Sequence, residues 1–138
     1  MLQRIQSIFL LVSSIAYWGL FAIPFASSGE SNHSLFSDKV LNLNDHIGLL
    51  VAGVLGGLLS LAAIFLFKNR KLQQSISYLS FIPALVLIGL AYWLFNTTSG
   101  GSLGLGMGLP VVSAICSLVA ATFIKKDEKL VKSMDRLR

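Results

Sequence analysis

Four long stretches of this chain contain no charged residue, and they limit its fold more than any other feature. They cover residues 5–25, 47–67, 75–95 and 103–124, so each has 21 or 22 residues. A helix of that length rises about 32 Å, which matches the hydrocarbon core of a bilayer. The sequence therefore predicts an all-α, polytopic membrane protein, with four transmembrane helices in a single domain over residues 1–138.

Most of the Lys and Arg residues lie on one side of these predicted spans. Of the eleven, one precedes the first span, three lie between the second and third, and six follow the fourth. Short loops rich in Lys and Arg stay cytoplasmic, because they are costly to translocate and are attracted by the anionic inner leaflet. Both termini are therefore expected in the cytoplasm, with only Lys39 on the outer side. The cytoplasmic cations are Arg4, Lys68, Arg70, Lys71, Lys125, Lys126, Lys129, Lys132, Arg136 and Arg138.

Several kinds of chemistry lack the residues that they need. Proton-coupled transporters usually keep an acid or a His within the bilayer, and no predicted span has one in its interior. Cys116 is the only cysteine, so the chain has no internal disulfide and no dithiol pair. His33, Asp38 and His46 show no tight ligand spacing for a metal. We expect no catalytic residue, cofactor or metal.

Small residues are concentrated on the second and fourth spans. Apolar side chains do not drive helices together inside lipid, so small residues and polar contacts must do so. We expect these faces to bring the second and fourth spans together within one chain, and a homodimer through Gly53 and Gly57 is the alternative. The packing residues are Ala52, Gly53, Gly56, Gly57 and Ser60 in the second span, and Gly104, Gly108, Ser113, Ser117 and Ala121 in the fourth.

The outer loop over residues 26–46 carries two further local predictions. Phe36, Val40 and Leu43 lie on one side of a possible short helix on the outer membrane face. Asp45 precedes the second span, where its carboxylate is expected to cap the helix start.

The chain ends in the segment KKDEKLVKSMDRLR, residues 125–138, in which nine of fourteen residues carry charge. Its apolar residues follow helical spacing, and Glu128 precedes Lys132 in the favourable i, i+4 order. We expect a short amphipathic C-terminal helix that either rests on anionic lipid or docks on a protein partner. The apolar positions of this tail are Leu130, Val131, Met134 and Leu137.

The two ends of the chain, MLQRIQ and KDEKLVKSMDRLR, resemble those of a family of small four-span inner-membrane proteins of the Bacteroidota. Members commonly open with M-I-Q-R-I-Q and close with K-D-E-x-L-V-R-S-x-D-R-L-R. The family is a domain of unknown function, so the resemblance implies lineage and a location in the bacterial inner membrane, but no activity. It also implies that both motifs face the cytoplasm, where Arg4 and Gln6 would meet the tail.

These patterns favour a non-enzymatic accessory or scaffold subunit of a bacterial inner-membrane protein complex. The alternative is a small transporter or channel component for a neutral or lipid-like solute, suggested by Pro83, Pro110 and the glycines of the last two spans. Expected partners are anionic lipids and a larger membrane complex, with a homo-oligomer possible and no nucleic acid. Contacts are expected at the cytoplasmic cations named above and at Gln6, Leu130, Met134 and Leu137.

Overall fold

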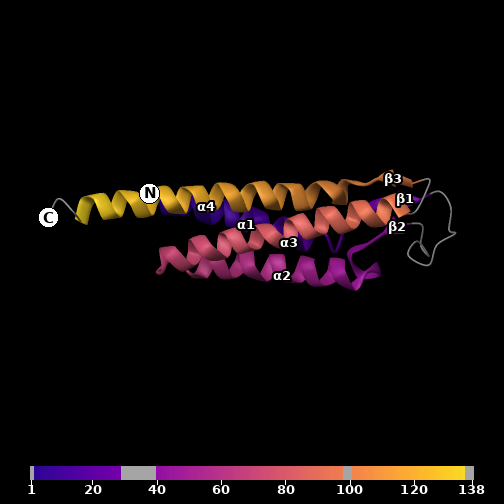
Figure 1. Cartoon of the computed structure of the whole chain (residues 1–138), viewed down its shortest axis with the longest axis horizontal. Coiled ribbons are helices and arrows are strands. Elements are labelled where there is room, and N and C mark those ends of the chain that lie inside the picture. The colour runs from indigo at the N-terminus through magenta and orange to yellow at the C-terminus, as the bar shows by residue number, and fades with distance from the viewer. Residues whose placement is uncertain (1, 29–39, 98–100, 136–138) are drawn as a thin grey trace.

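Four helices form an elongated bundle in the computed structural model, which describes residues 2–28, 40–97 and 101–135 (Figure 1). A small sheet lies at one end of the bundle, and the start of α1 and the end of α4 lie at the other. The helices are α1 (Leu2–Gly19), α2 (Ile47–Phe65), α3 (Arg70–Thr97) and α4 (Gly108–Asp135).

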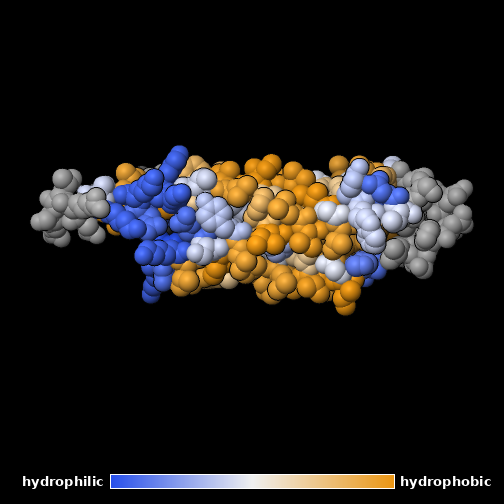
Figure 2. Space-filling view, in the orientation of Figure 1, coloured by the Kyte–Doolittle hydropathy of each residue, from blue (hydrophilic) through white to orange (hydrophobic). Residues whose placement is uncertain are grey.

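Three of the helices are long and apolar enough to cross a membrane, judged by length and composition. They cover Ile47–Phe65, Arg70–Thr97 and Leu105–Ser133, and the apolar part of α1, Ile5–Gly19, is shorter. Figure 2 shows a hydrophobic band around the middle of the bundle with hydrophilic residues at both ends. The protein is therefore a multi-pass membrane protein, as the charge-free stretches predict.

Neighbouring helices pack in a four-cornered arrangement. The helix α1 packs against α2 and α4, and α3 packs against the same two helices. Among the described residues, α2 and α4 share at most marginal contact, because they occupy opposite corners. The prediction that the second and fourth spans pack against each other is therefore wrong.

The small residues of α2 instead accommodate aromatic side chains of α1. A Cβ atom at Gly56 would overlap the ring of Tyr17, and one at Gly57 would lie 3.2 Å from Trp18 Nε1. A Cβ atom at Gly53 would lie 3.0 Å from the Leu43 side chain. This face is covered by the chain itself, so it is not available for the alternative homodimer. The predicted packing residues Ala52, Gly53, Gly56, Gly57 and Ser60 are all buried.

The predicted glycine ridge of the fourth span is also wrong, because α4 begins only at Gly108. Gly104 lies before the helix, where an added Cβ would come 2.8 Å from the Pro24 carbonyl oxygen. Gly108 has no heavy atom within 4 Å of such a Cβ, so it makes no close packing contact. The other three predicted positions, Ser113, Ser117 and Ala121, are buried in the bundle.

A three-stranded antiparallel sheet closes the end of the bundle opposite the termini, and we call this the sheet end. Its strands are β1 (Ala26–Ser28), β2 (Val40–Leu41) and β3 (Gly101–Leu103), in the order β2-β1-β3. In this register Ala26 lies between Leu41 and Leu103. The Phe25 N–H donates to the Leu41 carbonyl at 2.8 Å, and the Gly104 N–H donates to the Phe25 carbonyl at 2.8 Å.

The sheet changes the boundaries expected from the sequence. The first helix ends at Gly19, whereas the charge-free stretch continues to residue 25. Residues 20–23 form hydrogen-bonded turns, and Pro24, which lacks an N–H, lies two residues before β1. Val40 belongs to β2, so the predicted outer-loop helix is wrong there, and Phe36 lies outside the described residues. The C-terminal helix is the uninterrupted continuation of α4 as far as Asp135.

The start of α2 is capped by a different residue from the one predicted. His46 Nδ1 accepts a hydrogen bond from the Gly48 N–H at 3.0 Å. Asp45 instead accepts from the Asn42 N–H at 2.6 Å and closes the short 3₁₀ turn η2 (Leu43–Asp45) that precedes the helix. One residue therefore separates the expected cap from the observed one, which is within the usual uncertainty of helix boundaries.

Candidate functional site

The described residues among the predicted cations gather at the end of the bundle opposite the sheet, which we call the basic end. Figure 2 shows this end as a continuous hydrophilic region. These cations come from the turn between α2 and α3, from the start of α3 and from the last part of α4. The exposed ones are Lys68, Lys71, Lys125, Lys126, Lys129 and Lys132, and Arg70 is half-buried.

The two acids described at this end are both paired within the chain. Asp127 Oδ2 lies 3.5 Å from Arg70 Nη1, which joins α4 to α3. Glu128 Oε1 lies 2.7 Å from Lys132 Nζ, and this hydrogen bond holds the pKa of the Glu128 carboxyl below its usual range. The described lysines and Arg70 outnumber these two acids, so positive charge dominates the basic end.

The last turns of α4 project beyond the other three helices (Figure 1). Leu130 is 51% exposed on this projection, although it is apolar, and Val131 is half-buried. Exposed residues of the last part of α4, of the α2–α3 turn and of the start of α3 together form a surface that we call the basic docking surface. Its members are Lys68, Lys71, Lys125, Lys126, Lys129, Leu130 and Lys132.

Some predicted contact residues do not lie on this surface. Gln6 is only 1% exposed and lies inside the bundle, so the prediction that it contacts a partner or lipid is wrong. Its position on α1 directs it toward the other helices, which the short sequence motif could not indicate. The side chains of Arg4 and Met134, together with residues 136–138, lie outside the described part of the chain.

Hydroxyl groups connect α1 to each of the other helices. Ser13 Oγ donates to the Ser113 carbonyl of α4 at 3.2 Å and lies 3.3 Å from Ser60 Oγ of α2. The Tyr17 hydroxyl donates to the Ser80 carbonyl of α3 at 2.5 Å. The sequence carries a signal for this bond, because Tyr17 lies deeper than the expected interface belt and a buried Tyr hydroxyl usually finds a hydrogen-bond partner.

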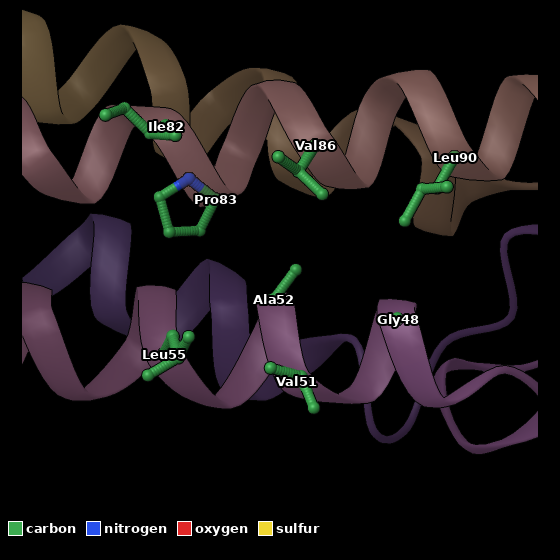
Figure 3. Close-up of a pocket in the computed structure, with 8 residues that line it drawn as sticks. All are labelled: Gly48, Val51, Ala52, Leu55, Ile82, Pro83, Val86 and Leu90. Atoms are coloured by element: carbon green, nitrogen blue, oxygen red, sulfur yellow. The ribbon is translucent and has the colours of Figure 1, made fainter.

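An apolar groove of about 290 Å³ lies between α2 and α3, nearer the sheet end (Figure 3). The Pro83 ring of α3 faces α2, and Ala52 points toward it from the opposite side. Gly48 and Ala52 leave room here because they are small. Other walls of the groove are formed by Leu55, Val86 and Leu90.

Within the described residues, no three His, Cys, Asp or Glu side chains gather closely enough to hold a metal ion. Arg70 and Asp127 form an ion pair between helices, which is a common structural arrangement.

Comparison with known proteins gives one match. The family model described as "Domain of unknown function (DUF4293)" matches residues 2–137. No curated protein and no solved structure matches the chain. The match extends over all four helices and the sheet, and it carries no activity.

Proposed function

The chain belongs to the DUF4293 family, and from this premise we propose that it is a non-enzymatic accessory or scaffold subunit of a bacterial inner-membrane protein complex. The observation that carries the proposal is the basic docking surface. The two acids described at the basic end are paired within the chain, while the surface consists of six exposed lysines and the exposed Leu130. Protein interfaces combine an apolar centre with a polar rim, and a cluster of lysines favours a partner that presents an acidic patch.

The membrane topology in this proposal has four crossings. The helix α1 packs along α2 and α4, so it would cross together with them despite its shorter apolar part. The basic end would lie in the cytoplasm, because ten of eleven Lys and Arg residues belong to segments on that side. The terminal motifs MLQRIQ and KDEKLVKSMDRLR support an inner-membrane location in the Bacteroidota by resemblance.

Anionic lipid would contribute to binding at the same surface. Each Lys near such a leaflet contributes about 1 kcal/mol, and this attraction falls off within about 10 Å. A partner protein would add contacts to Leu130, which is exposed in the last part of α4. The two contributions differ in specificity, because anionic lipid attracts the lysines through their charge alone.

The test is affinity purification from native membranes in a mild detergent, combined with crosslinking mass spectrometry. We expect a defined complex with crosslinks from Lys125, Lys126 and Lys129 to one larger membrane protein. The triple variant Lys125→Glu/Lys126→Glu/Lys129→Glu should lose the complex but still insert. The matched triple Lys→Arg variant should keep it. Recovery of the wild-type chain as a lone monomer or homo-oligomer would contradict the proposal.

A second candidate function follows from the groove between α2 and α3. Its walls are apolar, so it suits a neutral or lipid-like solute. In this case the protein would be a small transporter or channel component.

Photocrosslinking with a diazirine-bearing fatty acid tests the second function. We expect labelling of α2 and α3 peptides that falls at least threefold in Leu55→Phe/Val86→Phe, which fills the groove. Leu58→Phe is the matched control, because Leu58 is 51% exposed on α2 and does not line the groove. Equal labelling of all three proteins would exclude a specific site.

A further inference from the structure

Most buried polar groups in the bundle have partners within the chain, but two Gln side chains differ. The hydroxyls of Ser77, Ser80 and Ser117 donate to carbonyl oxygens of their own helices. In the part of the chain that the structure describes, Gln6 Oε1 and both Oε1 and Nε2 of Gln73 are buried without a hydrogen-bond partner. These carboxamides lie on α1 and α3, and their residues are 1% and 0% exposed.

The two carboxamides lie at similar depth in the bundle. Leu10 of α1 and Ile76 of α3 belong to one apolar cluster, together with Ala63 and Ala120. Gln6 precedes Leu10 by four residues and Gln73 precedes Ile76 by three, so they lie about 6 Å and about 4.5 Å closer to the basic end, respectively. They therefore occupy the layer just outside this cluster, and both point into the interior.

A third polar group lies next to this layer. Arg70 precedes Gln73 by three residues on α3, so the two share a helix face. Its Nη1 atom is buried without a hydrogen bond and has only the ion pair with Asp127 at 3.5 Å. The layer therefore contains hydrogen-bond acceptors and donors together. The acceptors are the carbonyl oxygens of the two Gln residues, and the donors are the Gln73 amide and Arg70 Nη1.

Buried donors and acceptors of this kind destabilise a fold unless something satisfies them. A protein partner or a lipid headgroup would need an opening, and Gln73 has no exposed surface. Water both donates and accepts, and it fits a space of about 15 Å³. It is therefore the ligand that suits this mixed set of groups.

We propose that Gln6, Gln73 and Arg70 form an internal hydration site at the basic end, where ordered water bridges α1 to α3. The site is closed toward the sheet end by Leu10, Ala63 and Ala120, which are all 0% exposed. Hydration therefore reaches the interior from one end and does not continue through the bundle. This inference does not depend on the proposed accessory function.

The first test detects water beside the Gln73 carboxamide directly. The full chain, labelled with ¹⁵N in its Gln side chains, is placed in lipid nanodiscs, and magnetisation transfer from water to the amide protons is measured by NMR. The Gln73 signal is identified by its loss in Gln73→Met. We expect transfer to Gln73. Its absence, including the case in which Gln6 and Gln73 bond directly to each other, would overturn the proposal.

The second test compares thermal stability of matched variants. Gln73→Met replaces the carboxamide by an apolar side chain of similar length. The water and Arg70 then lose a hydrogen-bond partner, so the apparent Tm should fall by several degrees. Gln74→Met is the control, because Gln74 is the neighbouring, half-buried residue, and its Tm should change by no more than a degree or two. A rise in Tm for Gln73→Met would show a dry, unsatisfied carboxamide and would overturn the proposal.

Discussion

Gly56 and Tyr17 show at the residue scale how α1 and α2 come into close contact. The Tyr17 ring is fully buried and its hydroxyl is bonded to Ser80, so it cannot move away from an added methyl group. Gly56→Ala should therefore destabilise the bundle by about 1–3 kcal/mol through overpacking. The measurement is unfolding by SDS titration in mixed micelles.

Gly89 provides the matched control for this prediction. An added Cβ there meets no heavy atom within 4 Å, and the residue lies within α3. Gly89→Ala should leave stability unchanged or raise it by up to about 1 kcal/mol, since Ala favours the helix. Equal effects of the two variants would show that the Gly56–Tyr17 contact does not limit packing.

The Tyr17 hydroxyl gives a second prediction at this scale. Tyr17→Phe keeps the ring in place but removes the bond to Ser80 of α3. We expect a loss of about 0.5–1.5 kcal/mol, which is the range for such bonds between membrane helices. Tyr92→Phe, at a residue that is 54% exposed, should have no effect in the same unfolding assay. A loss of similar size at Tyr92 would assign the effect to the ring substitution itself.

Sequence alone predicted part of this residue-scale arrangement. Helical spacing identified Ala52, Gly56 and Ser60 as one packing face, and the structure confirms their burial. The spacing could not identify the neighbour, because it describes one helix at a time. The close partner is the Tyr17 ring of α1, which no pattern within α2 encodes.

At the element scale, the sheet determines how the bundle ends. Ser27 of β1 and Ser102 of β3 are direct partners, and their Oγ atoms lie 3.0 Å apart. Ser27→Cys/Ser102→Cys, in a Cys116→Ser background, should therefore form a disulfide, because directly opposed strand residues have suitable separation. The faster-migrating product is measured on non-reducing gels, with each single-Cys variant as control. Failure to oxidise would contradict the β1–β3 pairing.

The helices were predictable from the sequence, whereas the sheet was not. Uninterrupted apolar length identifies a membrane helix, and α2 matches its predicted stretch closely. Strands of two or three residues are too short to show an alternating pattern. The pairing also joins residues 27 and 102, which are 75 positions apart in the chain. The sequence therefore predicts helix for the charge-free residues 20–25 and 103–107, although in the structure these residues belong to the sheet end.

At the scale of the whole molecule, charge and hydropathy divide the bundle along its length. The basic end, the hydrophobic band and the sheet end follow one another along the long axis (Figure 2). The order was predictable because lysines and arginines cluster in the sequence. The polar layer with Gln6 and Gln73 was not, because a Gln near the end of an apolar stretch also suits the headgroup region. Only the packing of the four helices shows that both are buried.

Cysteine labelling in membrane vesicles tests the central claim, that both basic segments of a multi-pass chain lie on the cytoplasmic side. Leu72→Cys, Leu130→Cys and Ser102→Cys are made singly in a Cys116→Ser background, which keeps every Lys and Arg. A membrane-impermeant maleimide should label Leu72→Cys and Leu130→Cys only in inverted vesicles, and Ser102→Cys only in right-side-out vesicles. Labelling of Leu72→Cys and Leu130→Cys from opposite faces would contradict the account.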